Sequence, residues 1–324
     1  MLTREQIQAA AASAGYPVES YEKVLTLLQV LDGVRAHPFL QSRLALKGGT
    51  ALNLFLFDLP RLSVDIDLNY VGAGDRETML AERPRVEQAL EQVFGRAGLT
   101  VKRAPTEHAG GKWRLSYLTA LGRSGTIEVD VNFMLRTPLW PATHRDSRDM
   151  GGVSAMRILL LDDCELAAGK LAALVARSAS RDLFDARQLL RRGDLNLRRL
   201  RIAFVVYGGI NREDWRTVSI ENVSTTVADV DSQLVPMLRQ DVRPARQDVK
   251  AWTAALIRET RELMGAVLPL SAAESEFLER LNGAGEIDAT LLTPDATEQT
   301  MIAAHPGLLW KAQNVRAHLL AGGG

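Results

Sequence analysis

Residues 46–70 read LKGGTALNLFLFDLPRLSVDIDLNY, and this stretch decides the expected fold. Residues 44–47 predict a short strand, Gly48-Gly49-Thr50 a turn, and residues 51–57 a short apolar helix. From residue 61 to residue 71 apolar and polar side chains alternate, which is the period of a half-buried strand. The stretch therefore predicts a strand, a turn, a helix and a second strand with one polar face.

Two carboxylates lie two residues apart on that second strand. Asp65 and Asp67 share one face of the strand, within reach of a common cation. Like charges this close repel each other, and a divalent cation relieves the repulsion. Mg²⁺ favours carboxylate and phosphate oxygens. We therefore predict Asp65 and Asp67 as a metal-binding pair.

The glycine turn before this strand suits a phosphate group. Gly48 and Gly49 would let the backbone approach a phosphate closely, and the helix start offers free N–H groups to an anion. Thr50 could add a hydroxyl. Turn and carboxylates together describe a cradle for a triphosphate that faces its metal ion.

A third carboxylate is expected on a neighbouring strand. Residues 126–133, TIEVDVNF, alternate in the same way, with Glu128, Asp130 and Asn132 on one face. Asp130 lies in the middle of the strand and is the first choice as third metal ligand. Glu128 is the alternative.

A lysine in a helical pattern completes the candidate chemistry. Lys170 lies among small and apolar residues, where a lysine either reaches the surface or meets a phosphate. On an unbroken helix Lys170 and Asp185 would share one face, and Asp182 would lie off it. Residues 178–180, however, could end one helix and cap the next, so that either aspartate turns inward. We predict that Lys170 neutralises phosphate charge and that an aspartate orients it or acts as base.

Three segments resemble the AbiEii/AbiGii toxin family. They are LKGGTALNLFLFDLPRLSVDIDL (46–68), TIEVDVNF (126–133) and ELAAGKLAALVARSASRDLFDARQL (165–189). The family consists of nucleotidyltransferase-like toxins of bacterial toxin–antitoxin and abortive-infection systems and includes the MenT toxins. The resemblance spans most of residues 40–315.

The resemblance implies an α+β fold with two domains. Residues 1–155 would form a minimal nucleotidyltransferase fold, a mixed sheet with flanking helices, and residues 156–324 a mainly helical domain. The residue pattern agrees, since strands and helices mix before about residue 155 and helices dominate afterwards. The later helices are expected at 225–240, 246–266 and 271–283.

The resemblance also implies the transfer of a nucleotide from an NTP, with the tRNA 3′ end as acceptor in characterised members. That modification blocks charging and halts translation. The implied nucleotide-binding residues are Gly48, Gly49, Thr50 and Ser63. The implied catalytic residues are Asp65, Asp67 and Lys170 with Asp182 or Asp185, and Asp65, Asp67 and Asp130 would bind Mg²⁺.

The charge composition points to no general nucleic-acid affinity. Lys and Arg number 39, as do Asp and Glu, so the formal net charge is zero. An RNA partner would need a local patch. The candidate arginines of a first basic run are 187, 191, 192, 198, 199 and 201, and a second run lies between Arg239 and Lys250.

The chain is expected to be a soluble cytoplasmic protein. Cys164 is the only cysteine, so no intramolecular disulfide and no cysteine zinc site can form. The charged N-terminus is unlike a signal peptide, and no apolar run approaches membrane-spanning length. We expect an NTP, RNA and a cognate antitoxin as partners. The alternatives are the same chemistry on a protein or small-molecule hydroxyl, or a non-catalytic NTP-binding module.

Overall fold

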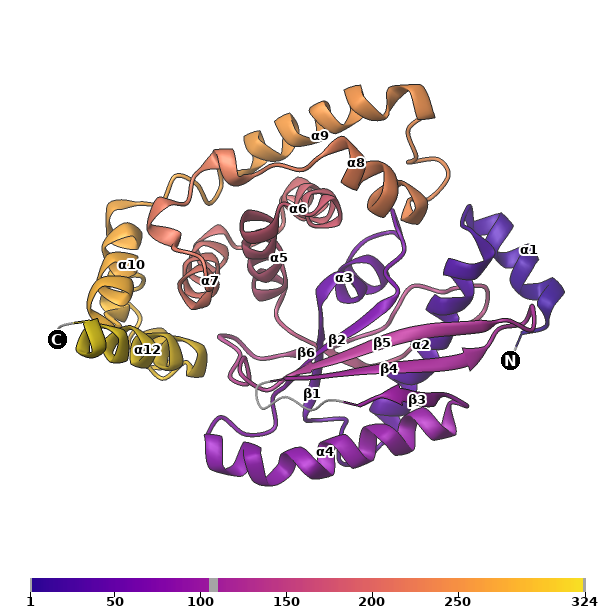
Figure 1. Ribbon diagram of the computed structural model, residues 1–324, viewed down its shortest axis with the longest axis horizontal. Coiled ribbons are helices and arrows are strands. Elements are labelled where there is room, and N and C mark those ends of the chain that lie inside the picture. Colours follow the sequence, from indigo (N-terminus) through magenta and orange to yellow (C-terminus); the bar gives the residue numbers. More distant parts are fainter. Residues whose placement is uncertain (1, 105–109, 323–324) are drawn as a thin grey trace. The chain divides into compact units, whose positions relative to one another are not determined.

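The two strands of the deciding stretch lie side by side in a seven-stranded sheet. β1 (Leu44–Lys47) and β2 (Asp65–Tyr70) pair antiparallel, while β2 pairs in parallel with β5 and β1 with β7. The computed structural model describes residues 2–104 and 110–322 and is shown in Figure 1. The strand order is β3-β4-β5-β2-β1-β7-β6, and the other strands are β3 (Thr100–Arg103), β4 (Gly110–Leu118), β5 (Ser124–Asn132), β6 (Thr143–Arg145) and β7 (Ile158–Leu160).

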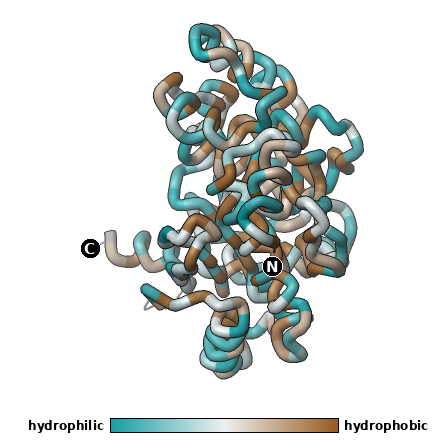
Figure 2. Tube along the Cα trace, turned by 90° about the vertical axis from the view of Figure 1, so that its right-hand side faces the viewer, coloured by the Kyte–Doolittle hydropathy of each residue, from teal (hydrophilic) through white to brown (hydrophobic). Residues whose placement is uncertain are grey.

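The sheet has one apolar and one polar face. In β5 the alternate residues Ile127, Val129 and Val131 are fully buried, whereas Glu128 and Asp130 between them are half-buried. The apolar face is covered by α2 (Val18–Ala36) and α4 (Arg76–Arg96), which touch where Val93 lies against Gly33. Figure 2 shows hydrophobic and hydrophilic residues alternating along many elements, as expected where one side of each is buried. The polar face is thereby left for other contacts.

The connection between β1 and β2 differs from the expected turn and helix. α3 (Gly48–Ala51) begins directly after β1 and continues as a π-helical turn over Leu52–Leu56. A separate turn is unnecessary because Gly48, with φ of +73°, changes the chain direction within one residue. β2 in turn begins at Asp65 rather than at Arg61, whose backbone forms an isolated bridge with Leu238.

The chain divides into two compact units. The first contains Met1–Asp162 with Leu234–Pro244, and the second contains Asp163–Gln233 with Ala245–Gly324. The division differs from the expected boundary after residue 155 because β7 pairs with β1 and is thus part of the sheet. α1 (Arg4–Ala14) is also part of the first unit.

The segment 234–244 joins the first unit through backbone hydrogen bonds. The Leu62 N–H donates to the Met237 carbonyl at 2.9 Å, and the Arg239 N–H donates to the Pro60 carbonyl at 3.1 Å. The helix expected over 225–240 is present in a shorter and irregular form. α8 (Val227–Asp229) continues without a break as a π-helical turn over Val230–Leu234 and a 3₁₀ turn over Val235–Met237, where Pro236 lacks the N–H that a longer α-helix needs.

The second unit is helical, which confirms the expected fold class. α5 packs against α6 and α7, and α6 packs against α9. Its helices, besides α8, are α5 (Asp163–Arg177), α6 (Ser180–Arg192), α7 (Leu197–Ile210), α9 (Val249–Met264), α10 (Ala272–Ala284), α11 (Ala296–Ala303) and α12 (Pro306–Gly322). Among the described residues no helix combines the length and apolar content needed to cross a membrane.

Candidate active site

The strand register brings the predicted carboxylates together on the polar face of the sheet. β2 and β5 run parallel with Asp65 beside Glu128 and Asp67 beside Asp130. On the other side of β2, Lys47 of β1 lies in register with Asp67. Residues in register point to the same face. Lys47, Asp67 and Asp130 therefore form a row across three neighbouring strands, which we call the charge row.

The members of the charge row interact electrostatically. Burial raises the pKa of Asp130, and the charge of Asp67 raises it further, while Lys47 and Lys112 oppose the shift. Burial lowers the pKa of Lys47, and Asp67 and Asp130 oppose that shift. The partly buried pair of carboxylates thus has two nearby lysines, Lys47 and Lys112, as partial compensation.

The two candidates for the third carboxylate have different neighbours in the sheet. The ammonium of Lys112 lies 3.0 Å from a carboxylate oxygen of Glu128, and this bond raises the pKa of Lys112. Glu128 therefore has a lysine as ion-pair partner and lies beside Asp65 in the sheet. Asp130 lies beside Asp67 and in register with Lys112, and its role as third metal ligand stays a prediction.

Neighbouring side chains come so close to the first two residues of α3 that both must be glycine. A Cβ on Gly48 would lie 2.2 Å from Oδ2 of Asp67. A Cβ on Gly49 would lie 2.8 Å from Oγ of Ser63 and 2.9 Å from Nη2 of Arg61. The glycine pair thus adjoins both the carboxylate of Asp67 and the hydroxyl of Ser63, and its binding of phosphate stays a prediction.

Thr50 holds the carboxylate strand in place. Its hydroxyl is fully buried and donates to the main-chain carbonyl of Asp65 at 2.5 Å. Asn53, one helical turn further on, donates from Nδ2 to the Gly49 carbonyl at 3.0 Å. The structure shows a positioning role for Thr50, and its contact with a nucleotide stays a prediction.

A second cluster, in the other unit, surrounds Lys170. Its ammonium lies 2.7 Å from Oδ1 of Asp182 and 3.1 Å from Oδ2 of Asp185. Nε of Arg177 lies 2.6 Å from Oδ2 of Asp182. Both candidate aspartates reach the lysine because the helix breaks at Ser178, with φ of +52°, so that α6 begins anew at residue 180.

The cluster is a buried, balanced set of charges. The side chains of Lys170, Asp182 and Asp185 are 9%, 2% and 0% exposed, too little for water to compensate them. Burial raises the pKa of Asp182, but the charge of Lys170 and the hydrogen bond from Arg177 together lower it to about 2. Asp182 is therefore ionised at neutral pH and keeps Lys170 in place.

Three site neighbours escaped the sequence analysis. Strand register places Lys47 beside Asp67 and Lys112 beside Asp130, and this register cannot be deduced from the sequence. A usable signal was present for Lys47, because it is the only polar residue of the strand that precedes Gly48. Arg61 is 2% exposed, lies against Gly49 and donates to the Leu62 carbonyl at 2.8 Å.

The first basic run is largely neutralised within the second unit. Arg187 and Arg191 each lie 2.6 Å from Glu259. Arg198 lies 2.7 Å from Glu298, and Arg201 lies 2.5 Å from Glu274. These arginines support helix packing, so the run is not the free cationic patch that the sequence suggested.

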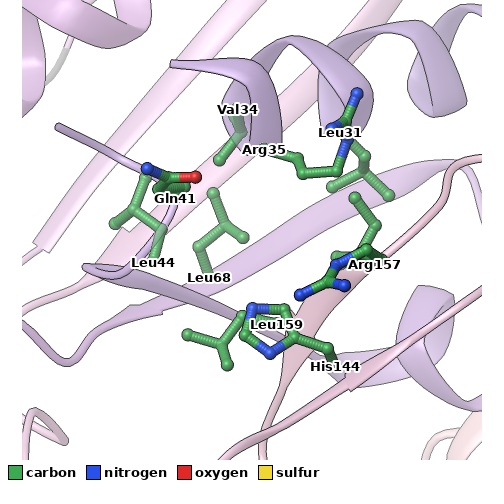
Figure 3. A pocket seen from close by; sticks show the side chains of 10 residues that line it. Leu31, Val34, Arg35, Gln41, Leu44, Leu68, His144, Arg157 and Leu159 are labelled. Carbon is green, nitrogen blue, oxygen red and sulfur yellow. The ribbon is translucent and has the colours of Figure 1, made fainter. Parts of the chain in front are cut away.

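The carboxylates form a pair rather than a closed metal cage. Among the described residues, no three His, Cys, Asp or Glu side chains are grouped as ready metal ligands. A pocket of about 100 Å³ lies elsewhere in the first unit, lined by Leu44, Leu68, His144 and Arg157 among others (Figure 3). None of the residues that line it belongs to the charge row.

Comparison with known proteins agrees with these features. The family model described as nucleotidyl transferase AbiEii toxin, type IV toxin–antitoxin system, matches residues 29–262, more than half of the chain. The structure is similar to MenT4, a nucleotidyltransferase toxin from Mycobacterium tuberculosis H37Rv, with a TM-score of 0.54 and 20% sequence identity over 98% of this chain and 99% of that chain. At this identity the likeness concerns the fold. None of the curated proteins matches the chain.

Gly48→Ala should destabilise the protein more than the matched change Gly98→Ala. Both glycines have a left-handed backbone, with φ of +73° and +72°, so each alanine costs about 1–2 kcal/mol. Only at Gly48 does the new methyl group meet a side chain, that of Asp67, whereas nothing lies within 4 Å at Gly98. Urea unfolding measures the free energy of unfolding of both variants. Equal losses of stability would contradict the close approach of Asp67 to Gly48.

Acid should remove the stability that Asp182 contributes. Because its pKa falls from 3.8 in the unfolded chain to about 2, the contribution is present above pH 3.8 and is lost between pH 3.8 and 2. It amounts to about 2 kcal/mol. Urea unfolding at pH 5 and pH 3 should therefore show that the free energies of unfolding of wild type and Asp182→Asn differ less at pH 3 than at pH 5. Asp231→Asn, at an exposed position, serves as control. A difference in free energy of unfolding between wild type and Asp182→Asn that does not change with pH would refute the stabilising role of ionised Asp182.

Proposed function

Since the chain belongs to the AbiEii family of nucleotidyl transferase toxins, we propose that it is a Mg²⁺-dependent enzyme that transfers a nucleoside monophosphate from an NTP to the 3′ end of tRNA. The observation that carries this proposal is the register of β2 and β5, which sets Asp67 beside Asp130 next to the glycines that begin α3. As a toxin of the type IV class it would be neutralised by a cognate antitoxin, in the cytoplasm.

Asp67 and Asp130, with Asp65 on the same face, would hold the Mg²⁺. The fit rests on the raised pKa of Asp130, because burial and the charge of Asp67 create a repulsion that a divalent cation relieves. Mg²⁺ commonly takes one or two protein carboxylates and completes its coordination with water and substrate phosphates. A carboxylate pair is therefore enough. When bound, the ion would stabilise the charge that develops on the transferred phosphate.

The residues around the pair would bind and orient the NTP. The backbone N–H groups at the start of α3 would receive the phosphates, and the Ser63 hydroxyl lies beside Gly49. Thr50 would keep Asp65 in position through its carbonyl. The acceptor hydroxyl would then attack the α-phosphorus, a new P–O bond would form, and the bond to the leaving pyrophosphate would break.

Lys170 would add positive charge for the phosphates, held by Asp182 and Asp185. A general base works best with a pKa near the working pH. With a pKa of about 2, Asp182 is too weak a base at neutral pH and is better suited to orienting Lys170. The two aspartates that the sequence left as alternatives would thus act together on one lysine.

The proposal of RNA as the acceptor follows from the sequence resemblance. Arginines of the first basic run form ion pairs with glutamates. The two alternatives are a protein or small-molecule hydroxyl as acceptor and a module that binds NTP without turnover. The neutral net charge is compatible with both.

Asp67→Asn and Asp130→Asn should each lower nucleotide transfer by more than about 100-fold, because changing even an outer-shell partner of a metal ligand already costs about 10–100-fold. Glu128→Gln is the matched control and should keep most activity, since Glu128 is engaged by Lys112. The assay incubates purified protein with each α-labelled NTP, total tRNA and cell lysate.

The destination of the label separates the alternatives. Label in tRNA supports the proposal, and label in protein or in a small molecule supports the second acceptor class. NTP binding without pyrophosphate release by the wild type would support the non-catalytic module. Full activity of Asp67→Asn would overturn the metal site.

A further inference from the structure

Lys47 is a positively charged residue that lies beside the proposed metal ligands on the same face of the sheet. It is the last residue of β1, in register with Asp67, which in turn lies beside Asp130. We propose that Lys47 is a built-in counter-cation: it holds the two carboxylates together in the metal-free protein and disfavours a free divalent cation, so that the metal enters together with the NTP. This inference rests on the proposed function.

The position of Lys47 is fixed by the backbone around it. β1 pairs with β2 on one side and with β7 on the other, so its last residue is held in a sheet interior. The carboxylate of Asp67 leans toward the residue that follows Lys47, since its Oδ2 would be 2.2 Å from a Cβ on Gly48. Lys47 therefore extends from the same face of the sheet as Asp67, its register partner.

The other charged side chains near the row have different roles. Asp65 lies on β2 beside Glu128 of β5, and Glu128 is bonded to Lys112 of β4 at 3.0 Å. On β4, Arg114 is in register with Glu128 and Lys112 with Asp130. Lys47 is thus the cation in register with Asp67.

The charge balance sets the order of binding. The proposed metal ligands Asp65, Asp67 and Asp130 carry two net negative charges together with Lys47, against three without it, so the lysine weakens the attraction for a bare divalent cation. A metal–NTP complex is negatively charged, and the positive charge of Lys47 attracts it. A free metal ion is therefore expected to bind more weakly than it would without Lys47, and a metal–NTP complex more tightly.

Manganese binding tests this inference without relying on activity. Mn²⁺ is titrated into wild type, Lys47→Met, Lys47→Arg and Lys102→Met, and free Mn²⁺ is followed by electron paramagnetic resonance with and without a non-hydrolysable NTP. Lys47→Met should bind free Mn²⁺ about tenfold more tightly, because one positive charge has been removed from the site. The gain in Mn²⁺ affinity on adding the NTP should shrink in the same variant.

The control variants show whether charge is the cause. Lys47→Arg keeps the charge, and Lys102→Met removes a lysine from the exposed strand β3, so both should resemble wild type. In EDTA, the melting temperature of Lys47→Met alone should fall, because the carboxylates lose their counter-charge. Lys47→Gln replaces Lys47→Met should the latter not fold.

Two negative results are distinguishable. If wild type binds Mn²⁺ and Lys47→Met binds it equally or more weakly, the counter-cation inference is wrong and the proposed function stands. If wild type binds no Mn²⁺, with or without the NTP, the metal site of the proposed function fails and the inference fails with it.

Discussion

The parallel pairing of β2 with β5 is the constraint on which the candidate site depends. It sets Asp67 beside Asp130 by main-chain hydrogen bonds, so that two mutually repelling carboxylates are held together by the sheet. The apolar faces of the same strands are fully buried, which makes a slip of register by one residue prohibitive. The energy of the core thus maintains an arrangement that the charges alone would disfavour.

The features around the pair follow from this constraint. Gly48 has no side chain because the carboxylate of Asp67 occupies that space, and Thr50 fixes the strand start through the carbonyl of Asp65. In the other unit a balanced ion cluster holds Lys170 without solvent. Each unit therefore carries charged groups whose positions are set by buried, local contacts, as expected of preorganised sites.

Local patterns in the sequence predicted much of this arrangement. The strand at 44–47, the alternation of residues 126–133 and the fold class were right because they depend on short-range periodicity. The helix expected at 225–240 is irregular and ends at Met237, because the backbone of Met237 and Arg239 hydrogen-bonds to the distant residues Leu62 and Pro60. Strand register and the partners of the arginines are likewise long-range, and so neither the pairing of Lys47 with Asp67 nor the Arg198–Glu298 pair could be predicted from the sequence alone.

The central claim is that Asp67, Asp130 and the α3 start form one site for a metal-bound NTP. A crystal structure of the protein with Mn²⁺ and a non-hydrolysable NTP, using the anomalous signal of manganese, tests it most directly. The account predicts manganese bound by Asp67 and Asp130 with the phosphates against Gly48 and Gly49. Manganese or phosphates bound away from these residues, for example in the pocket beside Arg157, would contradict it.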